Sequence, residues 1–281
     1  SGNAIFEIGV GSFSGADNGS VTGLITSDSS SKLALNFDSN QIVTATINSM
    51  GTIQQMGTGE VKLSGISTHD GPTIIDSGTL NIDVSDSNTT LSLTGAISGD
   101  GKLKKSGSGI LSLAGSNIFG GGIILSGGML VANNTNAIPS SGSITFEGGT
   151  FGFSSNNNND VSSRFAFTSL TDDLSLHIPT GVDVTLASGF SRSDLGAKLI
   201  KKGGGKLRLG ATNSFGGGAD VDGGEIFIGV GSSQGSLDNN VKLTTSSSRL
   251  IFDRSGNVNF SGIITGTGIV EQVNTGTLIL A

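Results

Sequence analysis

The sequence predicts an all-β protein whose strands coil into a parallel β-helix with about 24 residues per coil. Three observations support this fold class: glycine-rich segments that recur along the chain, short apolar runs that alternate with polar residues, and a high glycine content. The chain has 47 Gly among 281 residues, well above the usual ~7%. Recurring segments of this kind are typical of solenoids, in which each repeat packs only against its neighbours.

Three segments of the chain align with one another without gaps. They run from Gly51 to Ile82, from Gly101 to Ala132 and from Ala197 to Ile228, and a fourth copy extends from Gly268 to Ala281. Successive copies start 50, 96 and 71 residues apart. We interpret these offsets as two, four and three coils of about 24 residues, which would give the chain about eleven or twelve coils.

The apolar residues within the copies alternate with polar ones. The runs Leu80-Asn81-Ile82, Leu111-Ser112-Leu113 and Leu207-Arg208-Leu209 show this alternation. A period of two is that of a β-strand with one buried face. Gly, Asn, Asp and Ser separate the runs and supply turns and positive φ angles. The pattern therefore predicts short strands joined by tight turns.

We expect a single domain over residues 1–281, without an internal boundary. Residues 133–196 lack the glycine-rich unit. They contain the polar segment Ser154–Asp160, which we expect to protrude from the coils as a solvent-exposed loop.

The composition excludes several classes of protein. The chain has no Cys, Trp or Tyr, only 13% charged residues, and a formal net charge of −7. Without cysteine there is neither a disulfide framework nor a thiolate metal site. An acidic chain whose aromatic residues are all Phe is a poor binder of nucleic acid. No apolar run is long enough for a transmembrane helix, so we expect a chain that is not inserted in a membrane.

The glycine-rich copies resemble the autotransporter-associated β-strand repeat of type V secreted proteins, also called the passenger-associated transport repeat. The second copy carries the resemblance from Gly101 to Val131, and the third matches it from Leu199 to Gly224. The first copy departs from the pattern, because His69 stands where the others have Phe119 and Phe215. The motifs cover less than half of the chain.

The resemblance implies a right-handed β-helix that is exported to the bacterial cell surface or secreted. It also implies an outer-membrane translocator barrel, C-terminal to the passenger, as the partner of this chain. Members of the family act as adhesins, as toxins, or as stalks, and the repeat is associated with secretion and folding. The absence of cysteine is consistent with export of an unfolded chain.

We therefore expect a structural stalk and folding-promoting region of an adhesin or toxin, with no enzymatic activity and no cofactor. One alternative is direct adhesion, through a host receptor, a glycan or self-association. The second alternative is a polysaccharide-active enzyme, because such enzymes share the β-helix fold. The lack of Tyr and Trp, which would stack on sugars, argues against a catalytic sugar cleft.

The acidic and histidine residues give weak candidate sites. His69-Asp70 is the one adjacent His–acid pair, but nothing in the sequence supplies a nucleophile and an orienting third group. His177 follows the apolar run at Leu174 and has apolar neighbours. Two histidines make a His-based metal site improbable. Asp172-Asp173 and Asp220/Asp222 are candidate carboxylate pairs for glycosidic chemistry, and the second could bind calcium weakly. We expect both Asp220 and Asp222 to point outward beside an inward Val221.

Basic residues gather in the second and third copies and could form a stripe that attracts acidic glycans. We expect instead that they occupy outward strand positions, where lysine discourages edge-to-edge aggregation. These residues are Lys104, Lys105, Lys201, Lys202, Lys206 and Arg208. Phe119 and Phe215 are expected to wedge turns against a neighbouring coil. Asn117 and Asn213 are expected to satisfy turn backbone groups with their side chains.

Overall fold

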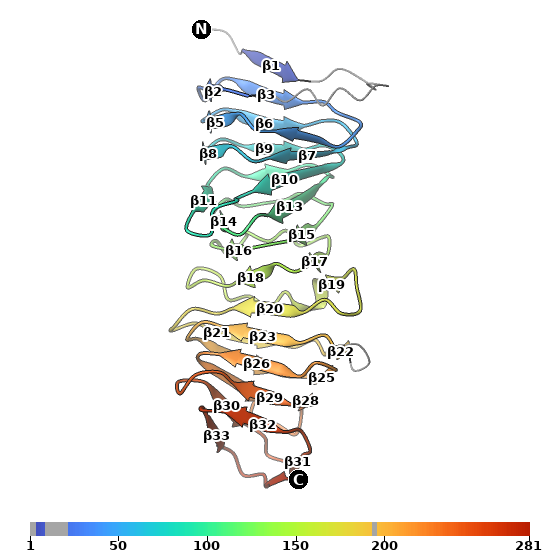
Figure 1. Ribbon diagram of the computed structural model, residues 1–281, viewed down its shortest axis with the longest axis vertical. Helices are drawn as coiled ribbons and strands as arrows, with labels where there is room; N and C mark the ends of the chain where they lie inside the picture. The colour runs from blue at the N-terminus through green and yellow to red at the C-terminus, as the bar shows by residue number, and fades with distance from the viewer. Residues whose placement is uncertain (1–3, 9–21, 193–195) are drawn as a thin grey trace. The chain divides into compact units, whose positions relative to one another are not determined.

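The computed structural model describes residues 4–8, 22–192 and 196–281, and it divides the chain into two compact units, Ser1–Thr145 and Phe146–Ala281. Both units are built from short parallel strands that are stacked coil upon coil (Figure 1). The coils contain roughly 21–24 residues, about 12 turns in all, and no α-helix occurs among the described residues. The predicted all-β parallel solenoid is confirmed.

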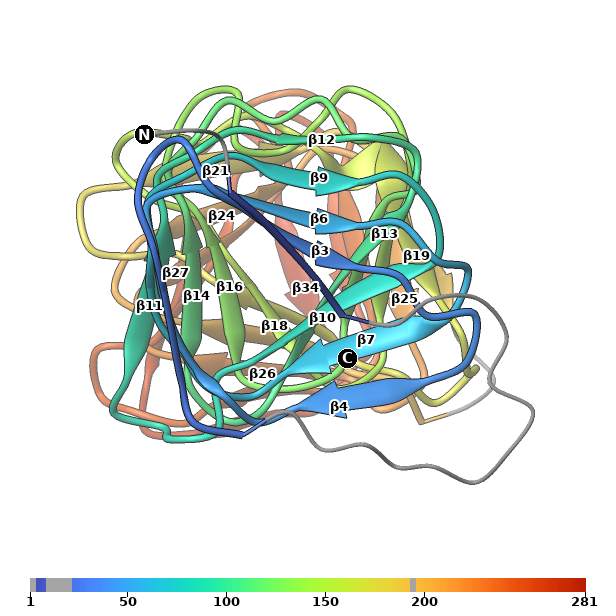
Figure 2. The same ribbon diagram turned by 90° about the horizontal axis from the view of Figure 1, so that it is seen from above.

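The first unit has three sheets around a common apolar interior (Figure 2). One sheet contains β1 (Ile5–Ile8), β3 (Lys32–Leu35), β6 (Thr52–Gln55), β9 (Thr73–Ile75) and β12 (Ile97–Ser98). A second contains β4 (Gln41–Val43), β7 (Glu60–Leu63), β10 (Thr79–Asp83), β13 (Lys102–Ser106) and β15 (Ile123–Leu125). The third contains β2 (Leu24–Ser27), β5 (Thr46–Ser49), β8 (Ile66–His69), β11 (Thr90–Leu93), β14 (Ile110–Leu113) and β16 (Met129–Ala132).

The second unit repeats this plan. One sheet contains β18 (Thr150–Gly152), β20 (Leu174–His177), β23 (Leu199–Lys202), β26 (Ala219–Asp222), β29 (Val241–Leu243) and β32 (Ile264–Gly266). Another contains β21 (Asp183–Leu186), β24 (Lys206–Leu209), β27 (Glu225–Ile228), β30 (Arg249–Phe252) and β33 (Ile269–Gln272). The third face is split into β22 (Ser191–Arg192), β25 (Thr212–Phe215) and β28 (Ser236–Asp238), followed by a separate pair, β31 (Val258–Phe260) and β34 (Leu278–Leu280). The remaining elements are β17 (Ile144–Phe146), at the boundary of the units, β19 (Phe165–Phe167) and a short 3-10 turn, Ser162–Arg164.

The period-two alternation places columns of apolar side chains inside the coils. In the first unit, Leu80 pairs in register with Val61 on one side and with Leu103 on the other. All three side chains are at most 1% exposed. Like residues stacked in this way bury apolar area on every coil, and such burial contributes roughly 25 cal/mol per Å². The inward columns therefore hold each unit together without disulfides.

The offset between the first two repeats does not equal two whole coils, and this part of the prediction is wrong. Val61 pairs with Leu80 on the next coil, and Leu80 pairs with Leu103 on the coil after that. Leu111, which aligns with Val61 in the repeats, lies on β14 in a different sheet. Because the coils of the first unit are shorter than 24 residues at most steps, the second copy has advanced by one face.

The described part of the segment without the glycine-rich unit that lies in the second unit, residues 146–192, contains a packed aromatic cluster. Phe151 and Phe165 lie in a chain of aromatic contacts, with ring centroids 5.8 Å apart. In the segment Ser154–Asp160, Ser154 and Asn157 are buried and form a small antiparallel bridge, whereas Ser155 and Asn156 are exposed. No helix among the described residues is both long and apolar enough to cross a membrane.

Candidate functional site

Lys105 lies inside the first unit, not on its surface. It is the second residue after Leu103 on β13, so the strand alternation turns both side chains inward. Its neighbours in register on the adjacent coils are Ile82 and Leu125, and it is 0% exposed. Lys201, at the same repeat position in the second unit, is likewise 0% exposed and lies between Leu176 and Val221. The prediction that Lys105 and Lys201 point outward is therefore wrong, and neither contributes to a glycan-binding stripe.

Each buried ammonium group donates hydrogen bonds to the backbone of a glycine-rich turn. Lys105 Nζ lies 2.5 Å from the carbonyl oxygen of Ser106, 2.9 Å from that of Gly107 and 3.3 Å from that of Gly127, which lies one coil further on. Lys201 Nζ lies 2.5 Å from the carbonyl oxygen of Gly203 and 2.9 Å from that of Gly223. One side chain thus links the turn that follows it to the turn of the next coil.

Glutamine occupies this position in the first and fourth copies and binds the turn that follows it. Gln55 aligns with Lys105, and its Nε2 lies 2.9 Å from the carbonyl oxygen of Gly57 and 3.2 Å from that of Gly59. Gln272 aligns with Lys201 and donates to the carbonyl oxygens of Asn274 and Gly276, at 3.0 and 3.1 Å. Sequence reasoning missed both glutamines. The repeat alignment contained the signal, because all four copies have a long side chain with an N–H donor at this position.

Glycine is required where the turns stack on one another. Gly128 has φ +57°, and a Cβ there would lie 2.2 Å from the carbonyl oxygen of Gly109 on the preceding coil. Gly224 has φ +67°, and its Cβ would lie 2.4 Å from Lys201 Nζ. A side chain at Gly128 would therefore collide with the backbone of the preceding coil, and one at Gly224 would collide with the ammonium group of Lys201. We call each buried Lys or Gln together with the glycine turns that it binds a glycine corner.

Burial changes the acidity of the two lysines. It lowers the pKa of Lys105 to about 8, against a smaller opposing effect of Asp83. It also lowers the pKa of Lys201 to about 8, opposed by Glu225 and Asp222. Both groups are still mainly protonated at pH 7. A protonated amine that donates to carbonyl oxygens has no free lone pair, so the arrangement supports cross-linking of turns and not nucleophilic chemistry.

His69 occupies a buried packing position, as the alignment with Phe119 and Phe215 predicts. It is 1% exposed, and its Nε2 lies 3.0 Å from the hydroxyl of Thr73. Phe119 and Phe215 are 0% exposed. His177 is half-buried on β20. The pKa of both histidines is lowered, for His69 by burial and for His177 by burial and by the nearby Lys201 and Lys202.

The lowered pKa of His69 predicts a loss of stability in mild acid. Below about pH 6.5 the unfolded chain binds a proton at this histidine while the folded chain resists it, so the free energy of unfolding falls as the pH falls. The contribution is at most about 1.4 kcal/mol per pH unit. In the His69→Phe variant we expect a shallower decrease between pH 6.5 and 5.5, measured by urea unfolding. Equal slopes for the two proteins would contradict this origin.

Asn117 and Asn213 bind the backbone of neighbouring coils, which confirms their predicted role. The side-chain amide of Asn117 donates to the carbonyl of Ala137 at 2.7 Å, and its oxygen accepts from the N–H of Ile97 at 2.8 Å. Asn213 Nδ2 donates to the carbonyls of Ala211 and Ser236, and its Oδ1 accepts from the N–H of Phe190.

The carboxylate pairs do not converge on a common point. Asp220 and Asp222 flank the buried Val221, as predicted, but Asp220 forms an ion pair with Lys198 at 2.9 Å and Asp222 accepts from Thr244. Asp172 accepts hydrogen bonds from its own turn, at Thr168 and Ser169. Asp173 accepts from the N–H of Lys198. Within the described ranges, no three His or acidic side chains are placed to hold a metal ion.

The outward basic residues are paired with neighbouring groups. Lys104 lies 3.5 Å from Glu60, and Lys206 lies 3.6 Å from Glu225. Lys202 donates to the hydroxyl of Thr150. Arg208 binds Asp183 at 3.0 Å and Asp253 at 3.3 Å, with its guanidinium over the ring of Phe227. For Lys104, Lys206 and Arg208 these contacts balance the positive charge locally.

The comparisons with known proteins agree with the architecture. The family model described as the passenger-associated-transport-repeat matches residues 54–82, 103–132 and 199–226, which are the segments that contain the glycine corners of Gln55, Lys105 and Lys201. The three matched segments are passenger-associated transport repeats, and they cover less than half of the chain. Together with the parallel β-helix, they support an autotransporter passenger domain.

The chain is 27% identical over 187 residues to the adhesin BmaC autotransporter of Brucella suis biovar 1 (strain 1330). The alignment covers 64% of this chain and 5% of that protein, so the chain spans a small part of the relative's length. No solved structure matches the chain.

Proposed function

We propose that this chain is a stalk segment of a cell-surface adhesin, and that its repeats promote folding of the passenger after export. The observation that carries the proposal is the glycine corner. In each copy the donor side chain binds a carbonyl two residues further along the chain, for example Gln55 with Gly57 and Lys201 with Gly203. Closing such a short loop costs little chain entropy, so each repeat can fix its own turn before distant contacts form.

A stalk role also agrees with the outer faces of the coils. Several charged residues on these faces are paired along the columns, for example Lys62 with Asp83 at 2.6 Å and Lys206 with Glu225 at 3.6 Å. Solenoids can nucleate at one place and add coils one at a time. We propose that the exported chain uses this property, and that a translocator barrel of the same polypeptide is its partner at the outer membrane. Its role is then non-enzymatic, with receptor binding or self-association as the second candidate because the relative is named an adhesin.

The register suggests an experiment in which exactly one coil is removed. Residues 103–122 form one coil with the Lys105 corner, since Leu103 pairs with Ile123. Residues 174–198 span one step of the register, since Leu174 pairs with Leu199, and they lie outside the segments that the family model matches. When the chain is displayed in front of a translocator barrel, we expect deletion of 103–122 to reduce surface display several-fold, and deletion of 174–198 to reduce it much less.

Surface display is measured by antibody labelling of intact cells, and total protein by immunoblot. An equal loss for both deletions would mean that any missing coil disturbs display, and would contradict a special role of the repeats. Undiminished display after removal of 103–122 would contradict it as well.

A further inference from the structure

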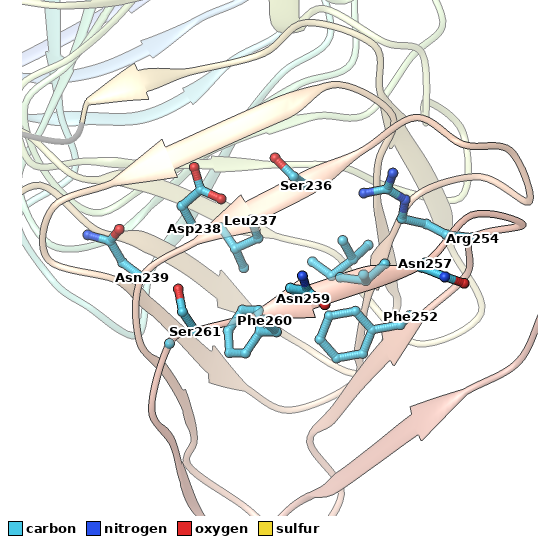
Figure 3. A pocket seen from close by; sticks show the side chains of 13 residues that line it. Ser236, Leu237, Asp238, Asn239, Phe252, Arg254, Asn257, Asn259, Phe260 and Ser261 are labelled. Atoms are coloured by element: carbon cyan, nitrogen blue, oxygen red, sulfur yellow. The ribbon is translucent and has the colours of Figure 1, made fainter. Parts of the chain in front are cut away.

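The hydrogen-bonded ladder of the second unit is broken on one face. β25 pairs with β28, and β31 pairs with β34, but β28 and β31 belong to separate sheets. On the other two faces of the same coils the ladders continue, through β26, β29 and β32 and through β27, β30 and β33. The break is therefore local to the face drawn in Figure 3, where β28 and β31 run beside each other with side chains between them.

The break leaves backbone groups without ladder partners. In a strand, the N–H and C=O of one residue point to the same side, and those of the next residue to the other. Ser236 N–H donates to Ala211 on the preceding coil, and Val258 N–H donates to Thr277 on the following coil. The N–H and C=O of Leu237 and of Asn259 consequently face the break. Among the described residues no ladder satisfies these groups, and unpaired amide groups away from water are costly.

The chain around the break contains several residues with unusual backbone conformations. The connection between β27 and β28 contains Gly229, Gly231 and Gly235, all with positive φ. The guanidinium of Arg254 donates to the carbonyl oxygens of Gly235, at 2.8 Å, and of Ser233. Asn239, which follows β28, has φ +80° and is the one non-glycine residue with positive φ in the described part of the chain. Such backbone outliers occur more often at functional sites.

A cavity of about 130 Å³ lies at the break. Its inner wall is apolar, with Leu237, Val258 and the edge-to-face rings of Phe252 and Phe260, whose centroids are 5.5 Å apart. Its rim carries hydroxyl, amide and carboxylate groups. The rim residues are Ser236, Asp238, Asn239, Asn257, Asn259 and Ser261. The volume suits one small group and its immediate attachments, and it is too small for an extended peptide strand.

We propose that this cavity binds the acetamido group of an N-acetylated amino sugar. A secondary amide supplies one N–H donor and one C=O acceptor, which complement the free C=O and N–H groups of Leu237 and Asn259. Its methyl group would rest on the apolar wall near Phe260. The sugar hydroxyls would then meet the polar rim, as is usual for a pocket in which a few polar groups fix the orientation of a ligand. Because the amide carries the recognition, the site does not require Tyr or Trp.

The test uses N-acetylglucosamine and N-acetylgalactosamine as probes, with glucose and galactose as matched sugars without the acetamido group. In amide-resolved NMR titrations we expect the N-acetylated sugars to bind with Kd of about 1–10 mM and to shift the backbone N–H signals of Leu237 and Asn259. The hexoses should bind at least about tenfold more weakly.

Exposed rim residues allow a variant that keeps the fold. Asp238→Ala with Asn259→Ala should weaken N-acetylated sugar binding about fivefold or more, since each lost hydrogen bond contributes a few-fold. Asp100→Ala with Asn88→Ala removes the same residue types at exposed positions in the first unit and should leave binding unchanged. The proposal is overturned if about 50 mM N-acetylated sugar shifts neither signal, if hexoses act equally, or if only an N-acetylated peptide amide binds.

Discussion

Replacing Lys201 by methionine is expected to lower the free energy of unfolding by about 2–4 kcal/mol, because the carbonyl oxygens of Gly203 and Gly223 lose their donor. Methionine keeps most of the apolar stem, so little packing is lost. The variant no longer buries a charged group, which offsets part of this loss of stability. Lys105→Met should behave in the same way, since the carbonyl oxygens of Gly107 and Gly127 lose their donor, whereas that of Ser106 still accepts from the N–H of Val84.

The chain offers its own control for this experiment. Glutamine fills the position in two copies and reaches the turn carbonyls from there. Lys201→Gln and Lys105→Gln should therefore cost about 1 kcal/mol or less. Lys102→Met, at an exposed position of β13, should be near neutral. Equilibrium urea unfolding followed by circular dichroism measures all of these. Methionine variants as stable as the glutamine variants would show that the donated hydrogen bonds contribute little.

The alternation of apolar and polar residues predicts the strands, and the same alternation governs the lysines. Leu103 and Lys105 are two residues apart on one strand, so the same rule that buries Leu103 buries Lys105. The general preference of lysine for the surface suggested otherwise. The acceptor groups that make burial tolerable belong to turn backbones, one of them a coil away at Gly127. Their position depends on how the coils stack, which the local pattern does not specify.

The coil length shows a second limit of the sequence. The number of residues between two copies includes whole coils and any further residues that place the second copy on a different sheet. These two contributions can be separated only when the pairing of the strands is known. The register of Val61, Leu80 and Leu103 separates them. The broken ladder between β28 and β31 could not be predicted either, because Leu237 and Val258 lie in runs that resemble the paired strands around them.

Raising the pH from 8 to 10.5 is expected to stabilise the folded chain relative to the unfolded chain. The pKa of Lys105 and Lys201 is about 8 in the folded protein, against 10.5 for an ordinary lysine. In this range the unfolded chain still holds both protons and the folded chain has released them. The unfolded state thus binds more protons, and the free energy of unfolding rises with pH. Below pH 8 both states are protonated, and the cost of the buried charge is constant.

The expected gain is about 1–3 kcal/mol for each lysine, because a full shift of this size corresponds to roughly 3 kcal/mol and the carbonyl oxygens favour the charged donor. Cys and Tyr, whose ordinary pKa values lie in or near this window, are absent from the chain. Urea unfolding at pH 7.5 and pH 10 measures the change. The double variant Lys105→Gln, Lys201→Gln retains the turns and should lose the increase.

Lys105 and Lys201 should contribute unequally to the rise in the free energy of unfolding between pH 8 and pH 10.5. A neutral amine has two N–H donors, and Lys201 serves two carbonyl oxygens, so it can keep both hydrogen bonds after losing its proton. Lys105 serves three and must give up one. Lys201→Gln should therefore remove more of the pH-dependent gain than Lys105→Gln. A reversed order, or a wild-type profile that matches the double variant, would mean that the acidity of these amines is set by something other than their burial in the glycine corners.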